Sequence, residues 1–198
     1  MKVFIKKISN TDLIKDLKLL LDKDKQQKVE RLQKIEDQKR AIISALLLND
    51  ILKYYGLSTS DIIYNEYGKP YLKKNEICFN ISHSGDYVVC AVSKNEIGVD
   101  IQEIRKVNDL IVQKKYTEEE QKYVTDDVTF TKVWTLKESY VKAIGKGLYQ
   151  KVEEVETINS NQLSKIGDFQ FQSMIIDNYC LSICYNKKDK FKIEFEYV

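Results

Sequence analysis

Two short segments of the sequence contain side chains that could bind phosphate and a metal ion. In the first, Ser82 and His83 follow a run of strand-forming residues, and Asp100 follows Gly98 in a second such run. Hydroxyl and imidazole groups hydrogen-bond phosphate oxygens, and a carboxylate is the hard oxygen ligand that Mg²⁺ prefers. Because these side chains are expected at the ends of strands, a ligand could reach them.

The second segment is a helical pattern in which Trp134, Glu138 and Lys142 lie four residues apart and share one face. Glu138 could bind Mg²⁺ or accept a proton, and Lys142 could neutralise phosphate charge. Together the two segments supply what phosphoryl transfer needs, namely metal-binding carboxylates from different elements and cationic side chains. Each residue alone also fits a structural role: a surface ion pair for Glu138 and Lys142, or core packing for Trp134.

Helical and strand patterns alternate along the chain and predict an α+β fold. We expect helices over residues 11–21, 23–36, 37–55 and 127–144, a capping box at Thr117 and Glu120, and helix ends at Gly56 and Gly145. We expect strands over residues 2–8, 62–64, 78–81, 87–92, 97–101, 152–158, 169–176, 179–185 and 191–198, with a tight turn at Asp177-Asn178. This order predicts two similar α+β halves in a pseudo-twofold arrangement, each with helices packed on an antiparallel sheet. The first half would comprise residues 1–102 and the second residues 103–198.

The composition excludes several classes of function. The 198 residues include 32 basic and 30 acidic ones, and a net charge of only +2 argues against a nucleic-acid-binding protein. No apolar run approaches the roughly 20 residues of a membrane span, and the N-terminus lacks a signal-peptide core, so a cytoplasmic protein is expected. The four cysteines form no Cys-x-x-Cys pair and His83 is the single histidine, which argues against a structural zinc site and a Ser-His-Asp hydrolase.

The two segments resemble the signatures of the 4′-phosphopantetheinyl transferase superfamily, and of its surfactin (Sfp) type in particular. One signature is Asn-x-Ser-His leading to Gly-x-Asp, here Asn80 to His83 and Gly98 to Asp100. The other is Trp-x-x-Lys-Glu-x-x-x-Lys, here Trp134 to Lys142. Gly145-Lys146-Gly147-Leu148 and Glu66-Tyr67-Gly68-Lys69-Pro70 are also similar to the family. After Leu148 only the strand pattern matches.

The resemblance implies transfer of 4′-phosphopantetheine from coenzyme A to a serine of a carrier protein, with release of adenosine 3′,5′-bisphosphate. Asp100 and Glu138 would bind Mg²⁺, and Lys142 would stabilise the charge on the departing phosphate. Glu138 would accept the serine proton, directly or through a water. The family often has Glu where this chain has Gln102, so Gln102 would bind the metal more weakly or through a water. The residues expected to bind coenzyme A are Lys25, Lys28, Arg31, Arg40, Lys69, Ser82, His83, Lys137 and Lys142.

Three of these lysines have alternatives. Lys25 and Lys28 could belong to a solvated helix face instead. Lys137 lies about 100° around the helix from Glu138 and could reach the ligand only from the flank.

The resemblance also implies a monomeric enzyme whose partner is an acidic apo acyl or peptidyl carrier protein. The basic stretch from Arg105-Lys106 to Lys114-Lys115 could dock such a carrier, or it could form a solvated amphipathic helix. Two other functions stay open. One is another Mg²⁺-dependent phosphotransferase, although the Gly-x-x-x-x-Gly-Lys-Ser/Thr loop is absent, and the other is a non-catalytic module that binds coenzyme A or a carrier protein.

Overall fold

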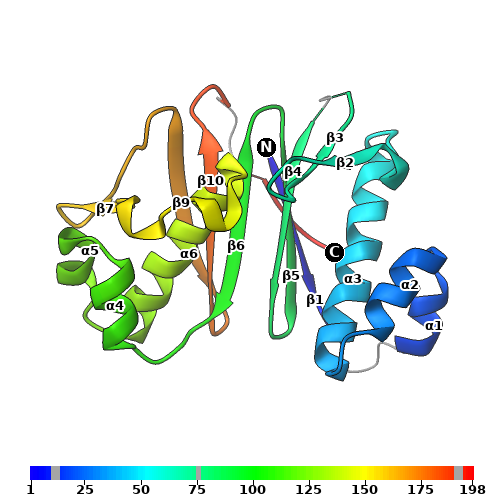
Figure 1. Cartoon of the computed structure of the whole chain (residues 1–198), viewed down its shortest axis with the longest axis horizontal. Coiled ribbons are helices and arrows are strands. Elements are labelled where there is room, and N and C mark those ends of the chain that lie inside the picture. The colour runs from blue at the N-terminus through cyan, green and yellow to red at the C-terminus, as the bar shows by residue number, and fades with distance from the viewer. Residues whose placement is uncertain (10–13, 75–76, 190–193) are drawn as a thin grey trace.

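The first sheet combines strands from both ends of the chain. The computed structural model describes residues 1–9, 14–74, 77–189 and 194–198. The sheet has the order β11-β1-β5-β4, with β11 at Glu194–Tyr197, β1 at Lys2–Lys7, β5 at Tyr87–Ser93 and β4 at Cys78–Ser84. The pairs β1–β5 and β5–β4 are antiparallel, whereas β1 and β11 run parallel. Three helices lie beside this sheet: α1 (Ile14–Leu19), α2 (Lys23–Glu30) and α3 (Ile35–Tyr54) (Figure 1).

The second sheet is antiparallel and has the order β6-β10-β9. Its strands are β6 (Ile97–Glu103), β10 (Tyr179–Asn186) and β9 (Phe169–Ile176), and its helices are α4 (Asp109–Lys115), α5 (Glu118–Tyr123) and α6 (Asp127–Ile144). Two small hairpins are formed by β2 (Ile62–Tyr64) with β3 (Pro70–Leu72) and by β7 (Ile158–Asn159) with β8 (Gln162–Leu163). Short 3₁₀ helices are η1 (Thr59–Asp61), η2 (Gly147–Tyr149) and η3 (Val152–Glu154).

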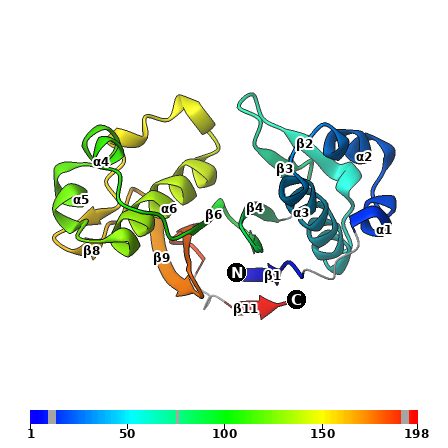
Figure 2. The ribbon, with the colours of Figure 1, turned by 90° about the horizontal axis from the view of Figure 1, so that it is seen from below.

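Apolar side chains fill the spaces between four layers, two of helices outside and two of sheet inside (Figure 2). Alternate residues of the sheets, such as Val3 and Val99, pack between the two sheets. The opposite face of the first sheet packs on α3 through residues such as Phe4, and that of the second packs on α6 through residues such as Cys184. The chain therefore has the α+β architecture expected from its alternating patterns.

Helix α6 begins and ends where its capping residues predict. Asp126 is the N-cap and its Oδ1 accepts from Thr129 N at 2.8 Å. Gly145 ends the helix in the left-handed conformation at φ 69°. The predicted helix over 127–144 is thus confirmed. The capping box at Thr117 and the turn at Asp177-Asn178 between β9 and β10 are confirmed as well.

Several predicted boundaries are wrong. The helix predicted over 23–36 ends at Glu30, and Arg31 is its C-cap. The next helix, predicted from residue 37, begins at Ile35. Instead of a strand over 152–158, the chain forms η3 and the two-residue strand β7. The predicted helix 11–21 and strand 191–198 lie partly outside the described residues, where only Ile14–Leu19 and Glu194–Tyr197 are assigned.

The division after residue 102 stays a prediction. Strand β6 pairs with β10 of the second sheet, and β11 pairs with β1 of the first. Among the described residues, none of the helices has the length and apolar composition of a membrane span.

Candidate active site

The two sheets meet at the edge strands β4 and β6, where polar side chains of β4 bind the main chain of β6. Asn80, Ser82 and Ser84 alternate along β4 and therefore point to one face. The hydrogen bonds are Val99 N to Asn80 Oδ1 (2.8 Å), Ile101 N to Ser82 Oγ (3.4 Å) and Glu103 N to Ser84 Oγ (3.1 Å). These bonds hold β6, and with it Asp100, at a fixed position beside β4.

Ser82, Asp100 and Lys142 form a hydrogen-bonded cluster at this junction. Ser82 Oγ donates to Asp100 Oδ1 at 2.8 Å, and Lys142 Nζ lies 2.5 Å from the same oxygen. Lys142 Nζ is also 3.0 Å from Ser82 Oγ. Side-chain exposure is 9% for Asp100 and 28% for Lys142, so a mostly buried carboxylate is neutralised by an ammonium group that reaches solvent.

Gly98 explains how α6 comes close enough to β6 for this contact. A Cβ at Gly98 would lie 2.0 Å from Ser139 O and 2.4 Å from Ala143 N, both main-chain atoms of α6. Gly98 and Asp100 are two residues apart and share a face of β6. The missing side chain at Gly98 therefore lets α6 place Lys142 against Asp100.

Glu138 lies one turn before Lys142 on α6 and is half-buried. Burial raises the pKa of Glu138, the negative charge of Asp100 raises it further, and Lys142 opposes these effects. The two carboxylates are thus close enough to interact. Together they carry two negative charges, which the single ammonium group of Lys142 neutralises only in part.

The β2–β3 hairpin closes the site from the other side. Asn65 Nδ2 donates to Gly145 O at 2.9 Å, and Lys69 Nζ donates to Ala143 O at 2.6 Å, so the hairpin is bound to the C-terminal end of α6. Burial lowers the pKa of Lys69. Lys69, Glu138 and Lys142 line one cavity of about 470 Å³. Because the walls of this cavity come from β3, β4, α6 and the chain after α6, the cavity lies between the two sheet–helix layers.

Arg40 and His83 lie near Lys142 and form a second group of side chains that can bind phosphate. Arg40 comes from α3, donates from Nη1 to Gly85 O at 3.3 Å and pairs with Asp37. His83 is exposed, yet the surrounding protein lowers its pKa, and the positive charges of Arg40 and Lys142 lower it further. The structure thus brings together five of the residues expected to bind coenzyme A, namely Arg40, Lys69, Ser82, His83 and Lys142.

Three expected phosphate ligands lie on or next to α2, at the outer end of the molecule (Figure 1). Lys25 pairs with Asp22 at 3.0 Å, and Lys28 and Arg31 are exposed. The structure does not bring these three residues into contact with the Asp100 cluster. Gln102 does lie near it, on the same face of β6 as Asp100, and donates from Nε2 to Ser84 Oγ at 3.0 Å.

Lys137 points away from the cavity and into the protein. Its ammonium group lies 2.7 Å from Glu120 Oε2, and both side chains are fully buried. It also donates to the carbonyl oxygens of Val152, at 3.0 Å, and Val155. The expected contact of Lys137 with coenzyme A is therefore not made in this conformation, because its fully buried ammonium group is already bound to Glu120, Val152 and Val155.

Three residues that build the site, Ser84, Asn65 and Glu120, are not among the site residues expected from the sequence. The alternation Asn80-x-Ser82-x-Ser84 is a period-two polar pattern, and it could have predicted a polar seam along one face of β4. Glu120 and Asn65 gave no such signal, because their partners are distant in the sequence. Glu120 was explained by its capping box, and its second role at Lys137 was missed.

The donor set suits a hard divalent cation that is shared with phosphate oxygens. Within the described part of the chain, no group of three or more His, Cys, Asp or Glu side chains gathers as a metal site. Mg²⁺ commonly needs only one or two protein carboxylates when substrate phosphates and waters supply the other ligands. The mutual repulsion that raises the pKa of Glu138 beside Asp100 is what a bound cation would relieve.

Comparisons with known proteins match nearly the whole chain. The family described as "4′-phosphopantetheinyl transferase superfamily" matches residues 96–184, and the one described as "4′-phosphopantetheinyl transferase, N-terminal" matches residues 9–95. The chain is 31% identical over 180 residues to 4′-phosphopantetheinyl transferase gsp of Aneurinibacillus migulanus, covering 83% of this chain and 76% of that protein.

Two further comparisons are less extensive. The chain is 33% identical over 135 residues to 4′-phosphopantetheinyl transferase Sfp of Bacillus subtilis (strain 168), covering 63% of this chain and 60% of that protein. A crystal structure of Thermotoga maritima holo-[acyl-carrier-protein] synthase is 21% identical, with a TM-score of 0.37, and covers 45% of this chain and 61% of that one.

Proposed function

We propose that this chain, which belongs to the 4′-phosphopantetheinyl transferase superfamily and is of the Sfp type, transfers 4′-phosphopantetheine from coenzyme A to a serine of a carrier protein. The observation that carries the proposal is the contact of Asp100 from β6 with Lys142 from α6, and its electrostatic interaction with Glu138, beside a cavity that Glu138 and Lys142 line. These elements are distant in the sequence, and Gly98 allows their close approach. Carboxylates and an ammonium group at one site are suited to a phosphoryl transfer between two oxygens.

In the proposed reaction the carrier serine oxygen attacks the phosphorus atom that carries the pantetheine group. A new P–O bond forms to the serine, the P–O bond of the pyrophosphate breaks, and adenosine 3′,5′-bisphosphate departs with the electron pair. Glu138 accepts the serine proton, and its raised pKa brings it closer to the operating pH of a base. Lys142 stabilises the negative charge that develops on the departing phosphate. Both groups are preorganised by α6, so little reorganisation is needed during the transfer.

We further propose that Asp100 and Glu138 hold a Mg²⁺ ion, with Gln102 beside them on β6 binding it weakly or through a water. Bound there, the ion would neutralise pyrophosphate charge. The neutral amide of Gln102 is a weaker ligand than a carboxylate, and its Nε2 is already bound to Ser84.

The basic side chains around the cavity, with the imidazole of His83, would bind the phosphates of coenzyme A. Lys69 and Lys142 line it, and Arg40 and His83 lie near Lys142. Charge-assisted hydrogen bonds to phosphate are about twice as strong as neutral ones, so this group would set the position of the nucleotide. Lys25, Lys28 and Arg31 remain proposed ligands of the 3′-phosphate, and each would have to reach it from α2.

An acidic apo acyl or peptidyl carrier protein is the proposed partner. Helix α4 and the residues before it present Arg105, Lys106 and Lys114 to solvent, together with Leu110, which is 65% exposed. Exposed cations would accelerate encounter with an acidic partner, and an exposed apolar side chain would add contact area. We also propose a monomer, because one chain supplies all three residues of the reacting cluster. A cytoplasmic location is proposed because the four thiols are unpaired.

The test is incubation of the protein with apo carrier protein, coenzyme A and Mg²⁺, followed by intact mass measurement of the carrier. The proposal expects the carrier to gain the mass of phosphopantetheine. It expects Glu138→Ala to abolish this gain while coenzyme A still binds, as measured by calorimetry. If the wild-type protein binds coenzyme A and leaves the carrier mass unchanged, a non-catalytic binding module is the better account. Transfer of a phosphoryl group alone would indicate a different phosphotransferase.

A further inference from the structure

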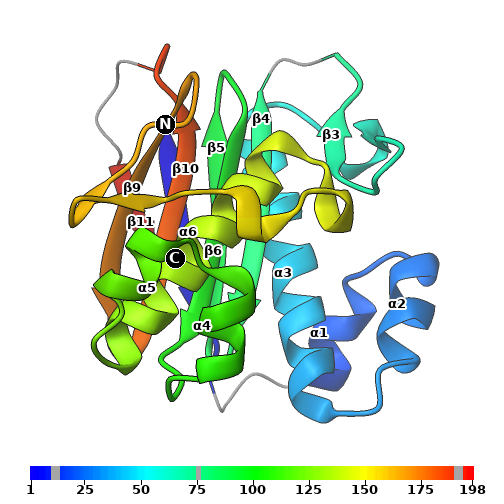
Figure 3. The same ribbon diagram turned by 60° about the vertical axis from the view of Figure 1, so that its left-hand side comes forward.

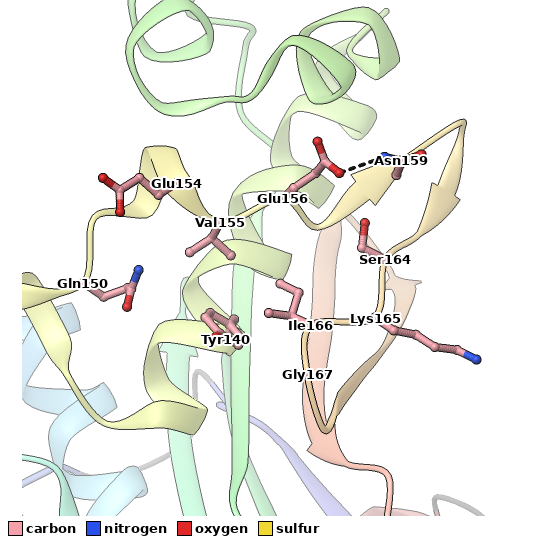
Figure 4. Close-up of a pocket in the computed structure, with 10 residues that line it drawn as sticks. All are labelled: Tyr140, Gln150, Glu154, Val155, Glu156, Asn159, Ser164, Lys165, Ile166 and Gly167. Atoms are coloured by element: carbon pink, nitrogen blue, oxygen red, sulfur yellow. Dashed lines mark hydrogen bonds between the residues drawn. The ribbon is translucent and has the colours of Figure 1, made fainter.

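The chain after α6 forms a thin wall of the catalytic cavity. Gln150, Lys151, Val152 and Glu153 line the cavity that also contains Glu138. Figure 3 shows this segment crossing in front of α6. Residues of the same segment, Glu154 and Glu156 among them, also line a second depression of about 640 Å³ (Figure 4). Of the two apolar side chains in residues 150–157, Val155 is buried and Val152 is half-buried, so apolar packing holds the segment mainly at one point.

The main-chain hydrogen bonds of this segment are local except at its end, where Thr157 O accepts from Ser164 N at 2.9 Å. The local bonds join Gln150 N to Gly147 O, Glu154 N to Lys151 O and Val155 N to Val152 O, which are contacts of single 3₁₀ turns. Such turns fix the local shape of the chain, but they do not attach it to α6. Its hydrogen-bonded attachment to α5 and α6 therefore comes from side chains of those helices.

Lys137 and Glu120 provide that attachment. Lys137 Nζ donates to Val152 O at 3.0 Å and to Val155 O, so one ammonium group binds two carbonyl oxygens of the wall. Glu120 Oε2 lies 2.7 Å from that ammonium, and Glu120 Oε1 accepts from Thr157 N at 2.7 Å and Thr157 Oγ1 at 2.8 Å. Tyr116 covers the ammonium group, with its ring centroid 5.9 Å from Lys137 Nζ. The pair is thus enclosed and connects the wall to both α5 and α6.

We propose that Lys137, acting with Glu120, is a positioning residue that holds the 150–157 wall of the catalytic cavity, and that it does not contact the substrate. Lys137 and Glu138 are adjacent on α6, so the same helix turn presents the reacting carboxylate on one side and anchors the facing wall on the other. A buried ion pair with every donor and acceptor bound is suited to fixing one arrangement, because any other arrangement leaves a buried charge unpaired. The kinetic part of the test rests on the proposed function, whereas the structural part does not.

The test compares Lys137→Met, Lys137→Arg, Glu120→Gln and the double variant Lys137→Met with Glu120→Gln. Leu52→Ala, at a fully buried residue of α3, is the matched control for a loss of stability that leaves the wall intact. For each variant, amide hydrogen exchange is measured over residues 147–157, and the affinity for coenzyme A is measured by calorimetry. The KM and kcat of the transfer are obtained from the rate at which the carrier protein gains mass. All measurements are made well below the lowest Tm of the set.

We expect Lys137→Met and Glu120→Gln to accelerate exchange of the 151–157 amides and to raise both KM and Kd for coenzyme A about tenfold or more, since small displacements at a site cost large factors. The double variant should show no greater effect than the more severe single variant, and Lys137→Arg should recover part of the affinity. Leu52→Ala should lower Tm without accelerating exchange of the 151–157 amides and without weakening coenzyme A binding. Unaltered exchange and affinity in Glu120→Gln, with weakened binding in Lys137→Met, would indicate a direct ligand contact by Lys137 and overturn the proposal. Equal loss of affinity in Leu52→Ala would overturn it too. If the wild-type protein shows no transfer, the proposed function fails, and the exchange and affinity measurements still test whether Lys137 and Glu120 hold the wall.

Discussion

Replacing Gly98 by alanine should disrupt the contact between β6 and α6 on which the site depends. The added Cβ would lie 2.0 Å from Ser139 O and 2.4 Å from Ala143 N, and ordinary contacts at such a carbon begin near 3.4 Å. Both neighbours are main-chain atoms of a helix and cannot rotate away. Helix α6 must therefore retreat from β6 by about 1.4 Å. Gly98 has no positive φ, so backbone conformation contributes nothing to the effect.

This displacement should affect both stability and activity. Overpacking of a well-packed contact costs about 1–3 kcal/mol, which for a chain of this size lowers Tm by about 2–12 °C. Moving α6 also separates Lys142 Nζ from Asp100 Oδ1, which lie 2.5 Å apart in the wild-type chain. Glu138 is on the same helix and is displaced as well. A misplacement of about 1 Å can cost about 100-fold in rate, so kcat/KM should fall by that factor.

The assay is carrier mass against time, combined with thermal unfolding of the same samples. Gly167→Ala is the control, since Gly167 has φ +58° and open space around it. In that variant the free energy of unfolding should fall by about 1 kcal/mol through backbone strain, while the rate of transfer should stay unchanged. If Gly98→Ala keeps its rate within about threefold of wild type and its Tm within about 1 °C, the close approach of β6 and α6 does not position the site.

Three other outcomes are expected. Glu138→Gln should raise Tm at neutral pH in metal-free buffer, because the raised pKa means that the folded state disfavours the ionised carboxylate. The gain should disappear as the pH falls below 4.5, where Glu138 is protonated in both states, and a gain that persists in acid would contradict this cause. Gln102→Glu should lower the Mg²⁺ concentration needed for half-maximal transfer, and an unchanged or increased requirement would remove Gln102 from the metal site. Ser82→Ala should weaken transfer about tenfold or more while the protein stays folded, because Asp100 and Lys142 lose their shared partner; wild-type kinetics would refute this role.

Local signals in the sequence predicted the parts of the fold that local interactions determine. Helix α6 is one example, because Asp126 and Gly145 cap it and its apolar residues repeat with helical spacing. The turn at Asp177-Asn178 is another. Placing Asp100 and Glu138 at one site depended on the family resemblance, since neither residue's spacing alone required it.

What the sequence did not reveal depends on contacts between distant segments. A strand was expected over 152–158, yet Lys137 and Glu120 hold this segment in short turns, and their carbonyl and amide partners have no sequence pattern. A glycine at position 98 of a strand predicts a close approach, but the sequence does not say which element makes it, because the atoms that a side chain there would meet are 41 and 45 residues further along the chain, in α6.

The most direct test of the account is Mn²⁺ binding in the presence of coenzyme A, followed by electron paramagnetic resonance as the ion is titrated. Mn²⁺ is the probe because it takes the same oxygen ligands as Mg²⁺. We predict that the wild-type chain binds the ion at a site that Asp100→Asn and Glu138→Gln each weaken about tenfold or more, while Glu103→Gln on the opposite face of β6 leaves it unchanged. Wild-type affinity in either of the first two variants would contradict the claim that β6 and α6 share one cation.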